Sequence, residues 1–134
     1  MSRPPIVFVI EDDASVLRSL ARLLDASGFA VVPCASAEEF LALPEPDGPA
    51  CIVTDIRMPG MTGFDLLEVL RGAGRHLPII LTSGDIDAAM ALDVRSADVV
   101  RFLTKPFASD DLLGALVEAF RSQSAPATPP RSDR

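Results

Sequence analysis

Acidic residues stand at the ends of two short apolar runs of this 134-residue chain. Glu11, Asp12 and Asp13 follow the first of these runs, PIVFVI. Asp55 follows a later one, ACIVT. Carboxylates held close together repel one another, and a hard divalent cation relieves that repulsion. All-oxygen ligands suit Mg²⁺, with Mn²⁺ as a second choice, so these residues indicate a divalent-metal site if the two runs end at the same edge of the fold.

Two further polar groups follow the remaining runs of this kind. Thr82 ends the run PIILT, and Lys105 comes directly after the run at 99–104. A carboxylate-held divalent ion keeps positions open for phosphoryl oxygens, to which a lysine adds positive charge and a threonine adds a hydroxyl donor. Asp55 is the expected nucleophile of such a site. Each residue alone has a commoner explanation as a turn, a cap or a surface charge, but their joint placement favours phosphoryl transfer.

These polar groups can form one site only if the elements that precede them end at the same edge of the fold. The apolar runs are continuous rather than alternating and rich in Val and Ile, which is typical of parallel strands covered on both faces. Segments with helical spacing separate them, so we expect an α/β fold of (βα)₅ type, in which ligands bind at the carboxyl ends of the strands. The expected strands are at 5–10, 30–34, 50–54, 78–82 and 99–104, and the expected helices are at 14–27, after Ser36, at 64–71, at 86–95 and after Ser109.

Local signals mark several helix ends. Asp13 is the expected N-cap of the first helix, and Ser36 with Glu39 fits the S-x-x-E capping box of the second. Ser109 is the expected cap of the last helix. Gly28 stands where the first helix is expected to end in the left-handed conformation.

Composition and charge exclude several classes of partner. The formal net charge is −7, which repels nucleic-acid backbones, and the chain has no Trp or Tyr to stack on bases, so we expect no direct nucleic-acid binding. No apolar run approaches the ~18 residues of a membrane span, and the N-terminus lacks a signal-peptide pattern. Two cysteines without a CxxC spacing fit a reducing compartment, so we expect a cytoplasmic protein with no membrane contact.

The length predicts one domain over residues 1–121. Residues 122–134, SQSAPATPPRSDR, are rich in Pro and Ser without an apolar anchor, and we expect a disordered tail or linker there. The single histidine, His76, is expected to be structural or inert. Cys34 and Cys51 fall in expected strands and are expected to be buried thiols.

Four segments resemble the response-regulator receiver domain of two-component signalling. They are VIEDD at 9–13, VTDIRMPGMTG at 53–63, LTSG at 81–84 and FLTKPF at 102–107. They occur in the family's order and span most of residues 5–121. The residues around Asp55 and Lys105 are most similar to those of receivers that often precede LuxR-type DNA-binding domains. The resemblance implies a flavodoxin-like, doubly wound sheet of five parallel strands in the order 2-1-3-4-5.

The resemblance implies that Asp55 accepts a phosphoryl group from a histidine kinase or a phosphotransfer protein. It implies Mg²⁺ held by Glu11, Asp12, Asp55 and the backbone carbonyl of Arg57, with Glu11 acting largely through water. The resemblance implies that the protein catalyses only its own phosphorylation and dephosphorylation and is not otherwise an enzyme. The further partners implied are a downstream protein or a C-terminal output domain, and a phosphorylation-dependent homodimer.

The resemblance also assigns switch residues. Lys105 pairs with the phosphoryl oxygens, Thr82 donates a hydrogen bond to them, and Phe102 occupies the aromatic switch position on the output face formed by the helix at 86–95, the strand at 99–104 and the last helix. Three departures from the family pattern accompany this. Phe102 has no hydroxyl, Ser83 occupies the small position after Thr82, and Asp98-Val99 replaces the usual Gly-Ala.

Competing functions fit the residues less well. An aspartyl-nucleophile phosphatase typically needs a carboxylate two residues after the nucleophile, where this chain has Arg57. A Rossmann or P-loop nucleotide binder needs a glycine-rich loop after the first strand, where this chain has Glu11-Asp12-Asp13. A phosphorylation-independent interaction module of the same fold remains the alternative. Whether the receiver stands alone or belongs to a longer regulator is left open by the residues.

Overall fold

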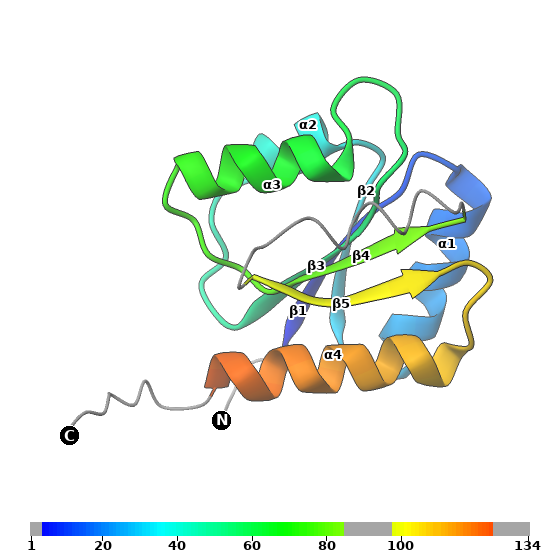
Figure 1. Ribbon diagram of the computed structural model, residues 1–134. Helices are drawn as coiled ribbons and strands as arrows, with labels where there is room; N and C mark the ends of the chain where they lie inside the picture. Colours follow the sequence, from blue (N-terminus) through cyan, green and yellow to red (C-terminus); the bar gives the residue numbers. More distant parts are fainter. Residues whose placement is uncertain (1–3, 85–97, 125–134) are drawn as a thin grey trace.

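The fold is an α/β sandwich built on one parallel sheet (Figure 1). The computed structural model describes residues 4–84 and 98–124. Within these ranges the elements, in chain order, are β1 (Ile6–Ile10), α1 (Ala14–Ala26), β2 (Ala30–Cys34), α2 (Ala37–Leu41), β3 (Ala50–Asp55), α3 (Gly63–Gly72), β4 (Ile79–Ser83), β5 (Val99–Thr104) and α4 (Ser109–Ser124).

The strand order is β2-β1-β3-β4-β5, and every neighbouring pair is parallel. The predicted doubly wound topology is therefore confirmed. Strand β3 is buried along its whole length because it lies in the middle of the sheet with helices on both faces. The register aligns Asp55, the last residue of β3, with Thr82 of β4, which brings two of the predicted site residues together.

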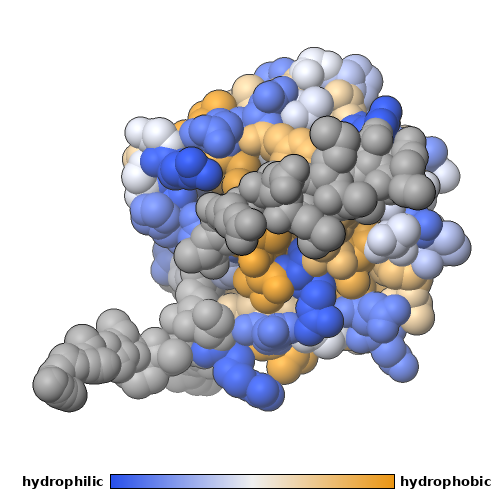
Figure 2. Space-filling model, viewed as in Figure 1, coloured by the Kyte–Doolittle hydropathy of each residue, from blue (hydrophilic) through white to orange (hydrophobic). Residues whose placement is uncertain are grey.

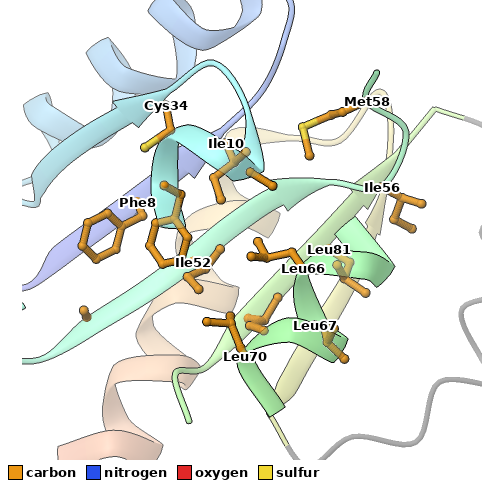
Figure 3. Close-up of a cluster of buried hydrophobic side chains, with 14 residues drawn as sticks. Phe8, Ile10, Cys34, Ile52, Ile56, Met58, Leu66, Leu67, Leu70 and Leu81 are labelled. Atoms are coloured by element: carbon orange, nitrogen blue, oxygen red, sulfur yellow. The ribbon is translucent and has the colours of Figure 1, made fainter. Parts of the chain in front are cut away.

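Two apolar layers hold the helices to the sheet. On the face covered by α2 and α3, side chains such as Ile52, Leu66 and Leu81 gather in one cluster (Figure 3). The Phe8 and Phe40 rings meet edge to face within this cluster, with centroids 5.0 Å apart. The second cluster joins α1 and α4 to the opposite face of the sheet. Burial on both faces explains why the strands are continuous apolar runs.

The helix starts follow local hydrogen bonding, with two corrections to the sequence predictions. The Asp13 carboxylate caps α1 by accepting from the Ser15 and Val16 amides, as predicted. Ser36 caps α2 as predicted, although the Glu39 carboxylate accepts from the Ala35 amide rather than completing the box at Ser36. The predicted cap Ser109 is wrong.

The last helix begins differently from the sequence prediction. Ser109 is already the first residue of α4, and Ala108 precedes it and accepts the first helical hydrogen bonds through its carbonyl. The Asp111 carboxylate accepts from the Ala108 amide at 3.4 Å. Helix α4 also continues to Ser124, three residues past the predicted boundary at 121, and the rest of the predicted tail lies outside the described residues.

The segment between β4 and β5 lies only partly within the described residues. The helix predicted at 86–95 lies outside the described residues. Asp98, which replaces a glycine of the family pattern, has a negative φ like every other described residue except three glycines. Its carbonyl accepts from the Ile79 amide at 2.7 Å, and its carboxylate pairs with His76 Nδ1 at 3.1 Å. His76 therefore links the starts of β4 and β5.

Two smaller expectations are also resolved. Gly28 adopts φ +96° at the end of α1, as predicted. Cys34 and Cys51 are buried free thiols, and burial raises the pKa of Cys34 to about 11 and that of Cys51 to about 12. No helix in residues 4–84 and 98–124 has the length and apolar character needed to span a bilayer.

Candidate functional site

The predicted acidic residues meet at the carboxyl edge of the sheet. Glu11 follows β1 directly, and Asp55 is the last residue of β3, which is the neighbouring strand. Carboxylate oxygens of Glu11, Asp12 and Asp55 all lie within 4.8 Å of one another. Parallel strands explain this meeting, because all of them end at the same edge.

The three carboxylates differ in their surroundings. Glu11 is 3% exposed, and its Oε2 accepts from the Asp13 amide at 3.1 Å, which fixes the carboxylate toward the sheet. Asp55 is 9% exposed. Asp12 is exposed, and within the described ranges it has no hydrogen-bond or ion-pair partner. The cluster thus combines two buried carboxylates with one that faces solvent.

Lys105 bridges the two buried carboxylates. Its Nζ lies 3.0 Å from Glu11 Oε1 and 3.2 Å from Asp55 Oδ2. The Lys105 amide donates to the Ser83 carbonyl at 2.7 Å, and its peptide bond to Pro106 is cis. Burial by itself lowers the pKa of the Lys105 ammonium, but the hydrogen bond to Glu11 and the charges of Asp55 and Glu11 outweigh it and raise that pKa above its ordinary value.

Thr82 and Ser83 complete the edge beside the acceptor. Thr82 is 3% exposed and is the register partner of Asp55, so the two side chains lie on the same face of neighbouring strands. The Ile56 amide donates to the Thr82 carbonyl at 2.9 Å, which ties the exit of β3 to β4. Ser83 is buried as well. The predicted hydroxyl donor therefore stands next to the predicted nucleophile.

Residues 56–62, called the β3–α3 loop below, lead away from Asp55. A hollow of about 400 Å³ is lined there by Arg57, Met58, Pro59 and Thr62. Gly63 closes the loop: its amide donates to the Ile56 carbonyl at 3.0 Å, and a Cβ on it would lie 2.8 Å from the Asp55 carbonyl oxygen. Only glycine lets α3 start this close to the acceptor. Gly63 belongs to the motif at 53–63, but the motif does not indicate this role, which depends on a contact across eight residues.

Phe102, the predicted switch residue, lies in β5 as the register partner of Leu81. It is partly buried and packs against the apolar cluster under α2 and α3. The site residues named from the sequence are thus gathered at one edge, with Phe102 on the neighbouring strand and Arg57 in the β3–α3 loop.

The donor chemistry fits a hard divalent cation. Three carboxylates of Glu11, Asp12 and Asp55 supply oxygen ligands only, as Mg²⁺ prefers. One ammonium, Lys105, faces two of these three carboxylates, so the cluster keeps a net negative charge that a cation can neutralise. This acidic group could hold a metal ion.

A doubly wound parallel sheet with an acidic cluster, a lysine and a strand-end threonine at its carboxyl edge defines an α/β domain equipped to handle phosphoryl groups. The chain matches the family described as the response regulator receiver domain over residues 7–117. It therefore belongs to the receiver domains, the phospho-acceptor modules of two-component signalling.

Similar proteins agree with this assignment. The chain is 42% identical over 118 residues to nodulation protein W of Bradyrhizobium diazoefficiens, covering 88% of this chain and 52% of that protein. It is also 42% identical over 119 residues to the transcriptional regulatory protein FixJ of Azorhizobium caulinodans, covering 89% of this chain and 56% of that protein. The chain thus spans about half the length of these curated relatives.

Solved structures show the same fold. The crystal structure of FixJ-N superposes with a TM-score of 0.79 at 35% identity, covering 96% of this chain and all of that one (100%). A receiver domain protein from Clostridium thermocellum superposes with a TM-score of 0.82 at 25% identity, covering 89% of this chain and 96% of that one. As a receiver domain, the chain is a signalling module rather than a classical enzyme.

Proposed function

We propose that Asp55 is the residue that accepts the phosphoryl group, and that the donor is a phosphohistidine of a sensor kinase or phosphotransfer protein. A carboxylate oxygen of Asp55 forms the new bond to phosphorus while the bond from phosphorus to the donor's imidazole nitrogen breaks. The observation that carries the proposal is the position of Asp55, whose Oδ2 lies 3.2 Å from Lys105 Nζ within the acidic cluster.

The residues proposed to hold Mg²⁺ are Glu11, Asp12 and Asp55, together with the backbone carbonyl of Arg57. When bound, the ion would neutralise charge on the transferring phosphoryl oxygens. Glu11 contributes from its buried position, where the Asp13 amide and Lys105 orient its two oxygens. Asp12, which faces solvent, would supply the exposed ligand of the site.

Lys105 and Thr82 are proposed to bind the phosphoryl group once it is on Asp55. The ammonium that pairs with Asp55 Oδ2 can transfer its contact to the more highly charged phosphoryl oxygens. The Thr82 hydroxyl donates to one of them, and this draws the end of β4 toward the site. The resulting change is proposed to pass to Phe102 on β5 and to residues 86–95, which lie outside the described residues.

The output face is proposed to include β5 and α4. Figure 2, which has the same view as Figure 1, shows hydrophobic surface between the layer of α2 and α3 and the helix α4. Val117 of α4 is 50% exposed, and Val100 and Leu113 are only partly buried. The proposed partners on this face are a C-terminal output domain, a separate protein or a second copy of the chain. Relatives described as transcriptional regulators support the first of these.

We place this signalling in the cytoplasm, in agreement with two buried thiols that are free. The proposed chemistry is limited to phosphorylation and dephosphorylation of Asp55 itself. Arg57 supports this limit, because it stands where a phosphatase of the aspartyl-nucleophile class carries a general-acid carboxylate.

Intact mass after exposure to acetyl phosphate and Mg²⁺ tests the proposal. We expect one phosphoryl adduct on the wild type, none with EDTA and none on Asp55→Asn. Asp25→Asn, which changes an exposed carboxylate near the far end of α1, is the matched control and should take up the adduct like the wild type. Equal labelling of Asp55→Asn would contradict the site. A folded wild type that binds neither a phosphoryl group nor beryllofluoride would favour the phosphorylation-independent module.

A further inference from the structure

The β3–α3 loop has one contact from a distant element that the phosphorylation site does not account for. Glu38, in the first turn of α2, reaches across to the loop, and its Oε2 accepts from the Met61 amide at 3.3 Å. The two residues are 23 positions apart in the sequence. This contact joins α2 to the segment that directly follows the acceptor.

The backbone of the loop is shaped to receive this carboxylate. Gly60 has φ +77°, and a Cβ on it would lie 3.0 Å from Glu38 Oε2. Glycine at this position therefore provides both the left-handed turn and the space above it. The neighbouring Glu39 has a different partner, since its carboxylate accepts from the Ala35 amide at the start of α2. Of the two adjacent glutamates, Glu39 therefore binds the start of its own helix and Glu38 binds the loop.

The two ends of the loop are fixed by other contacts, whereas its tip is held by Glu38. Met58 is 7% exposed and shares the apolar cluster of Ala37 and Phe40 of α2. Thr62 caps α3 through reciprocal bonds with Asp65. Between Met58 and Thr62, the hydrogen bond from the Met61 amide to Glu38 is the one that joins the tip to another element among the described residues. Arg57 lies in the same loop.

We propose that Glu38 is a positioning residue for the metal site, acting through the backbone of the β3–α3 loop. By holding the Met61 amide, Glu38 limits the conformations of the loop that carries the Arg57 carbonyl, the proposed metal ligand. The effect is preorganisation, since a loop held before the ion arrives loses less conformational entropy on binding. This inference rests on the proposed function, because the Arg57 carbonyl is a ligand only under that proposal.

The test compares Glu38→Ala with Glu38→Gln, which keeps an oxygen acceptor without the charge. Glu68→Ala removes an exposed carboxylate of α3 that pairs with Arg71 on the surface, and it is the matched control. Two quantities are measured: the hydrogen-exchange rate of the Met61 amide by NMR, and the Mg²⁺ affinity by calorimetric titration. We expect Glu38→Ala to accelerate exchange and weaken Mg²⁺ binding by about two- to tenfold, the range set by one hydrogen bond.

Glu38→Gln should keep most of the Mg²⁺ affinity, and Glu68→Ala should match the wild type. Unchanged Mg²⁺ affinity in Glu38→Ala, with faster Met61 exchange, would overturn the proposal, because Glu38 would then be a structural contact only. Equal weakening in Glu38→Gln and Glu38→Ala would also overturn it, since charge alone would explain the loss. A wild type without phosphoryl uptake would contradict the proposed function, and the exchange and Mg²⁺ measurements would still decide the role of Glu38.

Discussion

Lys105 is the single lysine of the chain, and it lies between two buried carboxylates. Without it, Glu11 and Asp55 would face each other while both are buried, and like charges repel more strongly in a buried region. The same ammonium is within reach of any negative group added to Asp55. One residue therefore stabilises the resting site and is already placed for the charge that phosphorylation would bring.

We expect stability to fall as the pH rises through the folded-state pKa of Lys105. That pKa lies above the ordinary value of 10.5, because the contacts with Glu11 and Asp55 outweigh burial. The ion pairs thus contribute their full stability below the unfolded-state value of 10.5 and lose it above the folded-state value. Urea unfolding of wild type and Lys105→Met in EDTA, from about pH 8 to pH 11.5, measures this contribution.

The difference in stability between the two proteins should shrink as the pH rises. Cys34 and Cys51 also make the fold less stable at alkaline pH. Burial raises their pKa values to about 11 and about 12, so the thiols ionise more readily in the unfolded chain than in the folded one. Both thiols are present in both proteins, so the comparison with Lys105→Met cancels them. A difference that stays constant over the whole range would show that the ammonium makes no net contribution.

At the scale of elements, helix starts decide how closely the loops approach the site. Helix α3 begins directly after the β3–α3 loop, and a capping box fixes its first turn: Thr62 Oγ1 accepts from the Asp65 amide at 3.1 Å, and Asp65 Oδ2 accepts from the Thr62 amide at 3.0 Å. Helix α4 begins without such a box at Ser109. The start of α3 is therefore the more strongly specified of the two.

This contrast predicts that two similar substitutions differ in their effect on the free energy of unfolding. Thr62→Ala should lower the free energy of unfolding by about 1 kcal/mol, the usual cost of losing an N-cap. Ser109→Ala should change it by less than about 0.5 kcal/mol, because Ser109 is inside the helix and does not cap it. Urea unfolding at neutral pH measures both. Equal losses, or a larger loss in Ser109→Ala, would contradict the assignment of the caps.

The sequence predicts the elements well where the signal is local. Continuous apolar runs predict all five strands, and the neighbours of Asp13 and Ser36 are enough to identify these residues as caps. The prediction for Ser109 is wrong because the sequence does not distinguish a serine at the N-cap from a serine at the first helical position. The choice between them depends on the Asp111 carboxylate, which accepts from the Ala108 amide.

The candidate site was predictable in its residue types but not in its contacts. Parallel strand ends are enough to bring Glu11, Asp55 and Lys105 to one edge. The bridge of Lys105 between two carboxylates was not predictable, because the Lys105–Glu11 hydrogen bond spans 94 positions. The contacts of Glu38 and Gly63 with the β3–α3 loop depend likewise on how helices pack on the sheet, and no local pattern reports that.

At the scale of the whole molecule, the net charge of −7 and the acidic edge favour cations and oppose anions. A folded chain gathers Glu11, Asp12 and Asp55 within 4.8 Å, whereas an unfolded chain keeps Asp55 far from the other two. A divalent ion should therefore bind the folded state far better than the unfolded one. Binding of this kind stabilises the whole fold, not only the site.

Mg²⁺ should accordingly raise the free energy of unfolding of the wild type, by about 1.4 kcal/mol at ten times its dissociation constant. Asp12→Asn should lose most of this gain while folding normally without metal, because Asp12 is exposed and has no hydrogen-bond or ion-pair partner in the described ranges. Asp25→Asn should keep the gain, since residue 25 lies about 18 Å along α1 from residue 13. Urea unfolding with and without Mg²⁺ measures all three, and an equal gain in Asp12→Asn would exclude Asp12 as a ligand.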